Sequence, residues 1–458
     1  MSALRFTPLL LLLVACDEAP RPSAAEPGER LAGGGTTVMR NDRGAFNQPA
    51  ANLSAERRLD FSAGRNFFRS PWVIAPASTT ARDGLGPLFN ANACQNCHGR
   101  NGRGHPPDTD ATTAVSMVVR LSIGSEPEPT YGNQLQDMAV AGVTPEGKVR
   151  VAYSPVDVHF TDGSRVELRA PRLRLSRLGY GPMHPDTVFS ARVAPPMIGL
   201  GLLEAISQAD LQANVDQQQA FDDGVNGRLN EVQDDIRGTI SAGRFGWKAG
   251  QPSLAQQNAH AFANDLGLTS ANHPSDDCTV AQTACRQAPS GQDAADDHEV
   301  SANIERLVLF YTRNLAVPAR RNSNVPQVQL GKQLFHQAGC QTCHVPSYTT
   351  RTDAAEPELA NQRIYPYTDL LLHDMGEGLA DSLGEYTATG RDWRTPPLWG
   401  VGLTEAVSGH TQFLHDGRAR NLLEAVLWHG GEAQAAQRRV LTFNAEQRAA
   451  LLAFLNSL

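Results

Sequence analysis

Two copies of the pattern Cys-x-x-Cys-His hold the residues of this chain that are best suited to chemistry. The copies consist of Cys94, Cys97 and His98, and of Cys340, Cys343 and His344. Two thiols three positions apart can each form a thioether to one vinyl group of a haem, and the histidine that follows can ligate the iron. The pattern therefore predicts two covalently bound c-type haems.

A single box of this kind could instead be a redox dithiol or half of a zinc site. Each box, however, follows a Leu-Phe pair by the same four-residue spacer, Leu88-Phe89 in one case and Leu334-Phe335 in the other. We interpret each pair as part of a helix that leads into the box. The repeat of lead-in, box and histidine favours two haem-binding units.

The elements expected to position the boxes are mostly helical. Residues 304–315 carry apolar side chains at helical spacing, and Pro318 is expected to end that helix. A last helix is expected to follow Asn444, a candidate N-cap, with Leu451 and Phe454 on one face. Such a terminal helix would cross the helix before the second box, as a cytochrome c unit requires.

The pattern changes between the first box and these helices. Residues 115–168 include alternating segments on either side of the turn signal Asp162-Gly163, which predicts a β-containing insertion. We therefore predict a mainly α fold with two cytochrome c-like haem domains. The N-terminal one, residues 48–320, is enlarged by the insertion, and the C-terminal one covers residues 321–458.

Length and charge limit the classes of function. A chain of 458 residues is long enough for about three domains with sizeable cores. Its net charge of −8 gives no basic surface of the kind that nucleic acids need. We therefore expect no nucleic-acid partner.

The N-terminus is typical of an export signal. Arg5 precedes a short apolar run that is too brief to span a bilayer, and Leu13-Val14-Ala15-Cys16 resembles a bacterial lipobox. We predict a lipoprotein signal peptide over residues 1–16, lipidation of Cys16, and a flexible tether over residues 17–47. An ordinary secretory signal is the alternative. With Cys16 lipidated, we expect a periplasmic protein of a Gram-negative bacterium, attached to the inner or outer membrane by its lipid anchor only. In either membrane the folded part should face the periplasm.

The remaining cysteines, Cys278 and Cys285, lie in a polar stretch. In an exported protein such a pair favours a disulfide, and a metal role is the weaker alternative because no suitably spaced histidines flank it. With this pair, the boxes and Cys16, all seven cysteines are accounted for. No thiol is left for nucleophilic catalysis.

Several long segments resemble the bacterial di-haem oxidoreductases, some of which are labelled thiol oxidoreductases. The segments are GRFGWK (243–248), VAPPMIGLGLLE (193–204), YPYTDLLLHDMG (365–376), WRTPPLWG (393–400), FLHDGRAR (413–420) and EAVLWH (424–429). The resemblance covers nearly everything after residue 55. The wider superfamily includes di-haem cytochrome c peroxidases and haem-dependent rubber oxygenases.

The resemblance implies a ligand for the second haem. In the peroxidases, a His-Asp-Gly triplet is followed fourteen residues later by a methionine that ligates the electron-donating haem. Here the triplet begins at His415, and the corresponding position is His429. We predict His429 as the distal ligand, which would lower the reduction potential relative to methionine. Met375 is the rival ligand, and a polar helix end is the structural alternative for His429.

The resemblance also implies a catalytic N-terminal haem with a distal glutamate. The best match is Glu204, an acid in an apolar run where desolvation would raise its pKa, although it could be a helix carboxylate without a catalytic role. Trp247 is the first choice for an aromatic relay between the haems, with Trp393 and Trp399 as competitors. Any of the three could simply pack. His373 and His415 are candidates to bind haem propionates.

A calcium ion near the domain junction is a further superfamily feature. Residues 222–228 keep part of an acidic glycine-rich loop, but the alternation of oxygen ligands is broken, so a solvated acidic turn is the alternative.

Three functions remain open. The first is a peroxidase-like oxidoreductase that passes electrons from the C-terminal haem to the N-terminal haem, which reduces peroxide or oxidises an unknown small-molecule or protein substrate. The second is an electron-transfer lipoprotein without turnover, and the third is a haem-dependent oxygenase. We expect a small periplasmic electron donor of the cytochrome or cupredoxin type.

Overall fold

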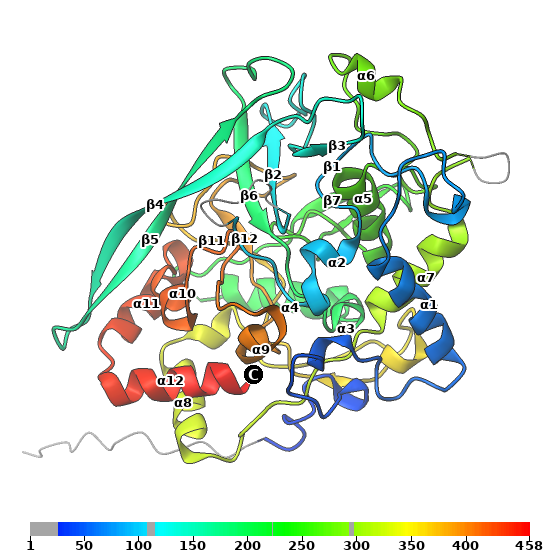
Figure 1. Ribbon diagram of the computed structural model, residues 1–458. Coiled ribbons are helices and arrows are strands. Elements are labelled where there is room, and N and C mark those ends of the chain that lie inside the picture. Colours follow the sequence, from blue (N-terminus) through cyan, green and yellow to red (C-terminus); the bar gives the residue numbers. More distant parts are fainter. Residues whose placement is uncertain (1–25, 108–114, 222, 293–296) are drawn as a thin grey trace, which may run out of the picture.

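The fold mixes helices with small antiparallel sheets. A computed structural model describes residues 26–107, 115–221, 223–292 and 297–458 (Figure 1). It contains 31% helix and 19% strand, so the prediction of a mainly α fold is wrong. Most of the strands lie in the long segment inserted into the N-terminal unit. The others are short pairs in the C-terminal unit, which are too short to show an alternating pattern in the sequence.

The helices are spread along the whole chain. They are α1 (Arg57–Arg69), α2 (Cys94–Cys97), α3 (Leu200–Glu204), α4 (Gln208–Gln219), α5 (Leu254–Leu266), α6 (Thr283–Arg286), α7 (Ala302–Arg313), α8 (Pro326–Gln337), α9 (Thr404–Ser408), α10 (Leu422–Leu427), α11 (Gln434–Leu441) and α12 (Ala445–Ser457). None of the described helices combines the length and the hydrophobicity that a membrane-spanning segment requires.

The described strands form two-stranded antiparallel sheets. The pairs are β1 (Leu88–Phe89) with β3 (Met138–Ala139), β2 (Met117–Ser122) with β6 (Val188–Val193), β4 (Lys148–His159) with β5 (Arg165–Ser176), β7 (Glu231–Asp234) with β8 (Thr239–Ala242), β9 (Tyr348–Thr349) with β10 (Arg363–Ile364), and β11 (Leu372–Asp374) with β12 (Asp392–Arg394).

Two pairs of crossing helices frame the two boxes. Helix α1 crosses α7, and helix α8 crosses α12. At each crossing a glycine allows the backbones to meet: a Cβ on Gly64 would lie 2.0 Å from the carbonyl oxygen of Leu307, and one on Gly331 would lie 1.9 Å from that of Ala450. The repeat therefore extends beyond the boxes to the helices that cover them.

Aromatic rings connect each crossing to its box. The centroid of Phe68, on α1, lies 6.3 Å from that of His98, and the centroid of Phe335, on α8, lies 6.2 Å from that of His344. Leu88-Phe89, in contrast, forms the short strand β1, so its interpretation as part of a helix is wrong. The lead-in of the first unit is α1, which is separated from the box by a longer stretch of chain.

Other sequence expectations about single elements can be compared with the structure. Asn444 is the N-cap of α12, as predicted, and it also forms a capping box with Gln447. Helix α7 buries Ile304, Leu307 and Val308 but ends at Arg313, before the expected stop at Pro318.

The long hairpin β4–β5 joins the two haem-binding units. It turns at residues 160–164, where Gly163 has a φ of +85°, close to the predicted turn signal. Its tip reaches the C-terminal unit, where Thr161 N donates to Leu441 O over 3.0 Å and Arg448 Nη1 donates to Asp162 Oδ2 over 2.8 Å. In Figure 1 the hairpin runs beside α10 and α11.

The chain before α1 packs against the rest of the molecule from residue 26 onward. We expected residues 17–47 to be a flexible tether, but Glu29 is buried between Arg320, at 2.9 Å, and Lys332, at 2.7 Å. The signal peptide and Cys16 lie outside the described residues, so their roles stay predictions.

Candidate functional site

The N-terminal box is held by a short helix and by one backbone carbonyl. Helix α2 carries Cys94 and Cys97, whose thiols form no disulfide. His98 follows directly and donates from Nδ1 to the carbonyl oxygen of Pro195 over 2.8 Å. Burial lowers the pKa of His98 to about 4, so the ring is neutral and Nε2 carries its lone pair.

The C-terminal box has the same arrangement. Cys340 and Cys343 are also free thiols, and His344 donates from Nδ1 to the carbonyl oxygen of Tyr367 over 2.9 Å. Burial lowers the pKa of His344 to about 4. In both boxes, a carbonyl on a distant segment sets the tautomer that leaves Nε2 available to a metal.

His429 lines the same cavity as His344. It follows α10 and donates from Nδ1 to the carbonyl oxygen of Ala425 over 2.8 Å, so its Nε2 is also left available. Burial lowers the pKa of His429, so its ring, like that of His344, is neutral. Met375, the rival ligand, lines the same cavity. The ligand assignment stays a prediction, and this geometry supports it.

One cavity of about 1050 Å³ is lined by both boxes and by His429. Its wall also carries buried guanidinium nitrogens without a hydrogen-bond partner, namely Arg103 Nε, Arg120 Nε and Arg192 Nη2. Unpartnered buried donors are costly unless a bound group supplies acceptors. A haem would bring two carboxylates and a large apolar ring, so the residues present fit this cofactor at both boxes.

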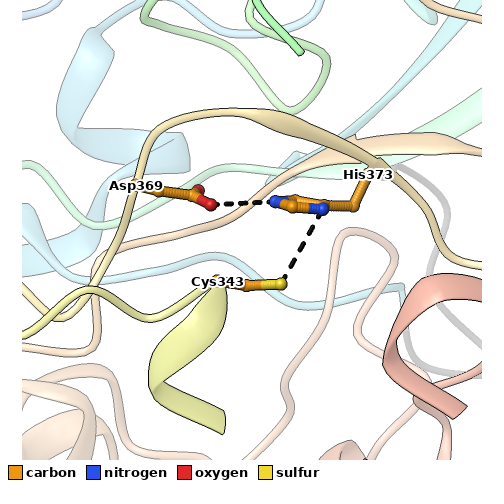
Figure 2. Close-up of side chains that lie close together, drawn as sticks. All are labelled: Cys343, Asp369 and His373. Atoms are coloured by element: carbon orange, nitrogen blue, oxygen red, sulfur yellow. Dashed lines mark hydrogen bonds and ion pairs between the residues drawn. The ribbon is translucent and has the colours of Figure 1, made fainter. Parts of the chain in front are cut away.

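A buried cluster lies next to the second box (Figure 2). His373 contacts the carboxylate of Asp369 through Nε2 over 2.9 Å, and its Nδ1 lies 2.7 Å from Glu432 Oε2 and 3.7 Å from the sulfur of Cys343. Although burial disfavours its charged form, Asp369 raises the pKa of His373 well above the usual value. Both ring nitrogens are therefore engaged by carboxylates, which disfavours the propionate contact that we expected for His373.

Cys343, Asp369 and His373 have the atom types and spacing of a metal site. The thiol of Cys343, however, belongs to the box, where a thioether would occupy it. This favours the cluster as an ion-pair network beside the box.

Two aromatic rings stack in the wall of the cavity, and a third meets them edge-on. His415 lies parallel to Trp393, with the centroids 3.6 Å apart and the planes at 10°, and its centroid lies 6.5 Å from that of Trp247. The ammonium group of Lys248 lies 3.9 Å from the centroid of Trp393 on the other side. Burial lowers the pKa of His415 to about 3, so the central ring is neutral. Trp247 and Trp393, which we considered as competing relays, belong to one array.

Glu204 lies in a different environment from the one we expected. Its carboxylate accepts hydrogen bonds from the backbone nitrogen of Leu254, at the start of α5, over 2.9 Å, and from Arg313 Nε over 2.7 Å. It is absent from the described lining of the cavity that both boxes share. The catalytic role of Glu204 stays a prediction, and these contacts favour a structural role that fixes α5 to α7.

Several polar residues of the cavity wall were missed in the sequence. Helix α5 lines the cavity with Gln257, Asn258 and His260, and Gln251 donates from Nε2 to His260 Nδ1 over 3.2 Å. The polar run within residues 254–266 was the available signal. A polar helix face is usually solvated, so the pattern of these residues alone could not place this face inside the molecule.

The disulfide and the acidic loop lie outside this cavity or at its edge. Cys278 and Cys285 are joined with a sulfur–sulfur distance of 2.00 Å. Asp222 of the acidic loop lies outside the described residues. Asp223 accepts a hydrogen bond from Val225 N over 3.1 Å, as in an ordinary turn. Calcium binding stays a prediction.

The duplicated boxes and the cavity that both of them line define a protein that binds two haems. Comparison with protein families agrees: residues 29–122 and 128–458 match the family described as "Di-haem oxidoreductase, putative peroxidase". The chain belongs to this di-haem oxidoreductase family.

Other comparisons add little. A comparison with curated proteins found no match. A solved structure of hydrazine synthase from Kuenenia stuttgartiensis, pressurised with xenon, aligns over 100% of both chains with 11% identity and a TM-score of 0.36. A similarity of this size supports no argument about this chain.

Proposed function

We propose that this protein is a peroxidase-like oxidoreductase. Electrons enter at the C-terminal haem and reach the N-terminal haem, where one molecule of hydrogen peroxide takes up two electrons and two protons and gives two molecules of water. Oxidation of an organic or protein substrate at the same haem is the variant of this reaction.

The observation that carries the proposal is the array of Trp247, His415 and Trp393. These buried rings lie in the wall of the cavity that both boxes line. A stack with a 3.6 Å centroid distance leaves no gap between two of its members, and the third ring meets the stack edge-on. We infer that the array conducts electrons between the haems, with His415 as its middle ring.

The other residues of the site would bind and orient. When bound, haem supplies an iron that exchanges electrons with peroxide. His98 would hold the iron of the first haem, and His344 and His429 would hold the iron of the second. Arg103, Arg120 and Arg192 offer donors to the carboxylates of the cofactors.

The carboxylate of Glu204 is engaged by Leu254 N and Arg313 Nε, so we propose a second polar group of the cavity wall for contact with the peroxide. His260 lines the cavity, and burial lowers its pKa to about 4, so its ring is neutral. Gln251 donates to its Nδ1, so neutral His260 carries its proton on Nε2. We propose that His260 donates a hydrogen bond from Nε2 to the peroxide, because neither ring nitrogen keeps a free lone pair to take a proton.

We further propose that both haems are attached covalently, since all four box thiols are free. Covalent attachment by such boxes takes place outside the cytoplasm, which agrees with the export signal and lipobox of the sequence. We therefore propose a lipid-anchored periplasmic protein that accepts electrons from a small cytochrome or cupredoxin.

Two variants of His415 test the proposal. In His415→Phe the stacked ring remains, whereas in His415→Ala the stack is broken. After reduction of the C-terminal haem, stopped-flow spectroscopy measures electron transfer to the N-terminal haem. We expect the alanine variant to be slower by about tenfold or more, a barrier increase of about 1.4 kcal/mol, and the phenylalanine variant to stay near the wild type. Equal rates in all three proteins would contradict the role of the array.

A further inference from the structure

A second cavity, of about 440 Å³, shares no lining residue with the first. It is formed by residues 30 and 39–41, and by residues 319–325 before α8. Its lining includes four arginines, Arg30, Arg40, Arg320 and Arg321. Four guanidinium groups around one cavity are unusual in a chain with a net charge of −8.

Two of these arginines are already neutralised by carboxylates. Arg320 Nη1 lies 2.9 Å from Glu29 Oε1, and Arg40 Nη2 lies 2.6 Å from Asp42 Oδ2. Arg30 and Arg321, in contrast, have no carboxylate partner among the described residues. The cavity therefore keeps two positive charges without a counter-charge in the described part of the chain.

Arg321 is only partly satisfied. Its Nη2 donates to the carbonyl oxygen of Asn456 over 2.6 Å, and its Nη1 is shielded from solvent without a hydrogen-bond partner. A shielded guanidinium N–H without an acceptor costs free energy in the empty state. A bound anion would remove that cost.

Backbone and amide donors add to the positive charge. Helix α8 begins at this cavity, and its N-cap, Val325, offers no side-chain cap. The positive end of the helix dipole is thus left for another acceptor. Asn41 and Asn322 also line the cavity, and neither side chain has a hydrogen-bond partner within the described residues.

We propose that this cavity binds a phosphate group, either free or in the headgroup of an anionic phospholipid. Several tetrahedral oxygens match several converging donors, and a guanidinium fork can bind two of them at once. Met39 and Val325, which also line the cavity, are 59% and 44% exposed, and these apolar surfaces suit a phosphate that is joined to a lipid. This site does not depend on the proposed function.

Calorimetric titration of the haem-loaded full chain tests the site. Inorganic phosphate is one probe and soluble dihexanoyl phosphatidylglycerol is the other, both at low ionic strength. We expect binding to the wild type, a loss of affinity of about tenfold or more in both Arg321→Gln and Arg30→Gln, and no change in Arg438→Gln. Arg438 is an exposed arginine on α11 without an ion pair among the described residues, so it is a matched control.

The two probes distinguish the sources of phosphate. Tighter binding of the lipid, lost in the same two variants, identifies a headgroup site, and binding of inorganic phosphate alone identifies a free-phosphate site. Thermal melts of each variant show whether it is folded. Arg30 is exposed, so Arg30→Gln still tests the site if Arg321→Gln is unstable. No binding of either probe, or binding that both variants retain, would overturn the proposal.

Discussion

Three histidines of this site are oriented in the same way. His98, His344 and His429 each donate from Nδ1 to a backbone carbonyl, at 2.8, 2.9 and 2.8 Å. A hydrogen bond at Nδ1 fixes the tautomer and increases the basicity of Nε2. The side chains alone would allow either nitrogen to face the cavity, so the acceptor carbonyls determine which nitrogen is available to iron.

Replacing His429 by methionine tests the second of the two ligands predicted for the C-terminal haem. A thioether stabilises ferrous iron relative to imidazole, so His429→Met should raise the reduction potential of this haem by about 0.1 V, within the roughly 0.8 V that axial ligands span. Spectroelectrochemistry measures the shift. Met375→Ala is the control and should leave the potential unchanged, whereas a change of ligand in that variant would make Met375 the ligand.

The ion pair of His373 predicts a pH-dependent stability. Its folded pKa is raised, so its contribution is complete below the unfolded pKa of about 6.5 and is lost as the pH rises through the folded pKa. His373→Gln should cost about 3 kcal/mol near pH 6, and the difference from the wild type should shrink at higher pH. Thermal melts of both proteins, near pH 6 and at higher pH, measure this difference in stability. His184→Gln, at a half-exposed position, should show no such trend.

The boxes and His429 could be predicted because each lies within a short motif. The contacts of Glu204 could not be predicted from local sequence, since Arg313, which engages its carboxylate, lies 109 residues further along the chain. The unpartnered nitrogens of the cavity arginines could not be predicted either, because whether a buried donor has a partner depends on the whole fold.

At the scale of elements, the crossing of α8 and α12 predicts an unusual effect of alanine. Gly331→Ala raises helix propensity, but its Cβ would lie 1.9 Å from the carbonyl oxygen of Ala450. We expect a net loss of about 1–3 kcal/mol as the helices separate. Denaturant unfolding of the haem-loaded protein measures it. Gln327→Ala, on the exposed side of the same helix, should be neutral or slightly stabilising, and equal stability of Gly331→Ala would contradict the close crossing.

The matching crossing of α1 and α7 was not predicted. We aligned Leu88-Phe89 with Leu334-Phe335 because the spacing to the box is identical, yet one pair lies in a strand and the other in a helix. The structural counterpart of Gly331 and Phe335 is Gly64 and Phe68, which have the same internal spacing. We aligned the two units at an equal distance from their boxes. That alignment misses the correspondence between α1 and α8, because the connection between α1 and α2 is longer than the one after α8.

At the scale of the whole molecule, the two haem-binding units share one cavity and are joined by the β4–β5 hairpin. Besides its contacts at the tip, Arg169 Nη2 of the hairpin donates to Gln412 Oε1 over 2.7 Å and to Gly417 O over 3.0 Å. The hairpin therefore holds the loop that carries His415. Its strands could be predicted from their alternation and turn, but their partner could not, because both faces of the hairpin mix polar and apolar residues.

The central claim is that electrons from the C-terminal haem reduce peroxide at an accessible N-terminal haem. Electron paramagnetic resonance of the full protein, first oxidised and then half-reduced, tests it most directly. We predict a low-spin signal from the C-terminal haem and a signal from the N-terminal haem that changes on addition of hydrogen peroxide, with two electrons consumed per peroxide. Two low-spin haems that stay unchanged with peroxide in both states would contradict it and favour an electron-transfer protein without turnover.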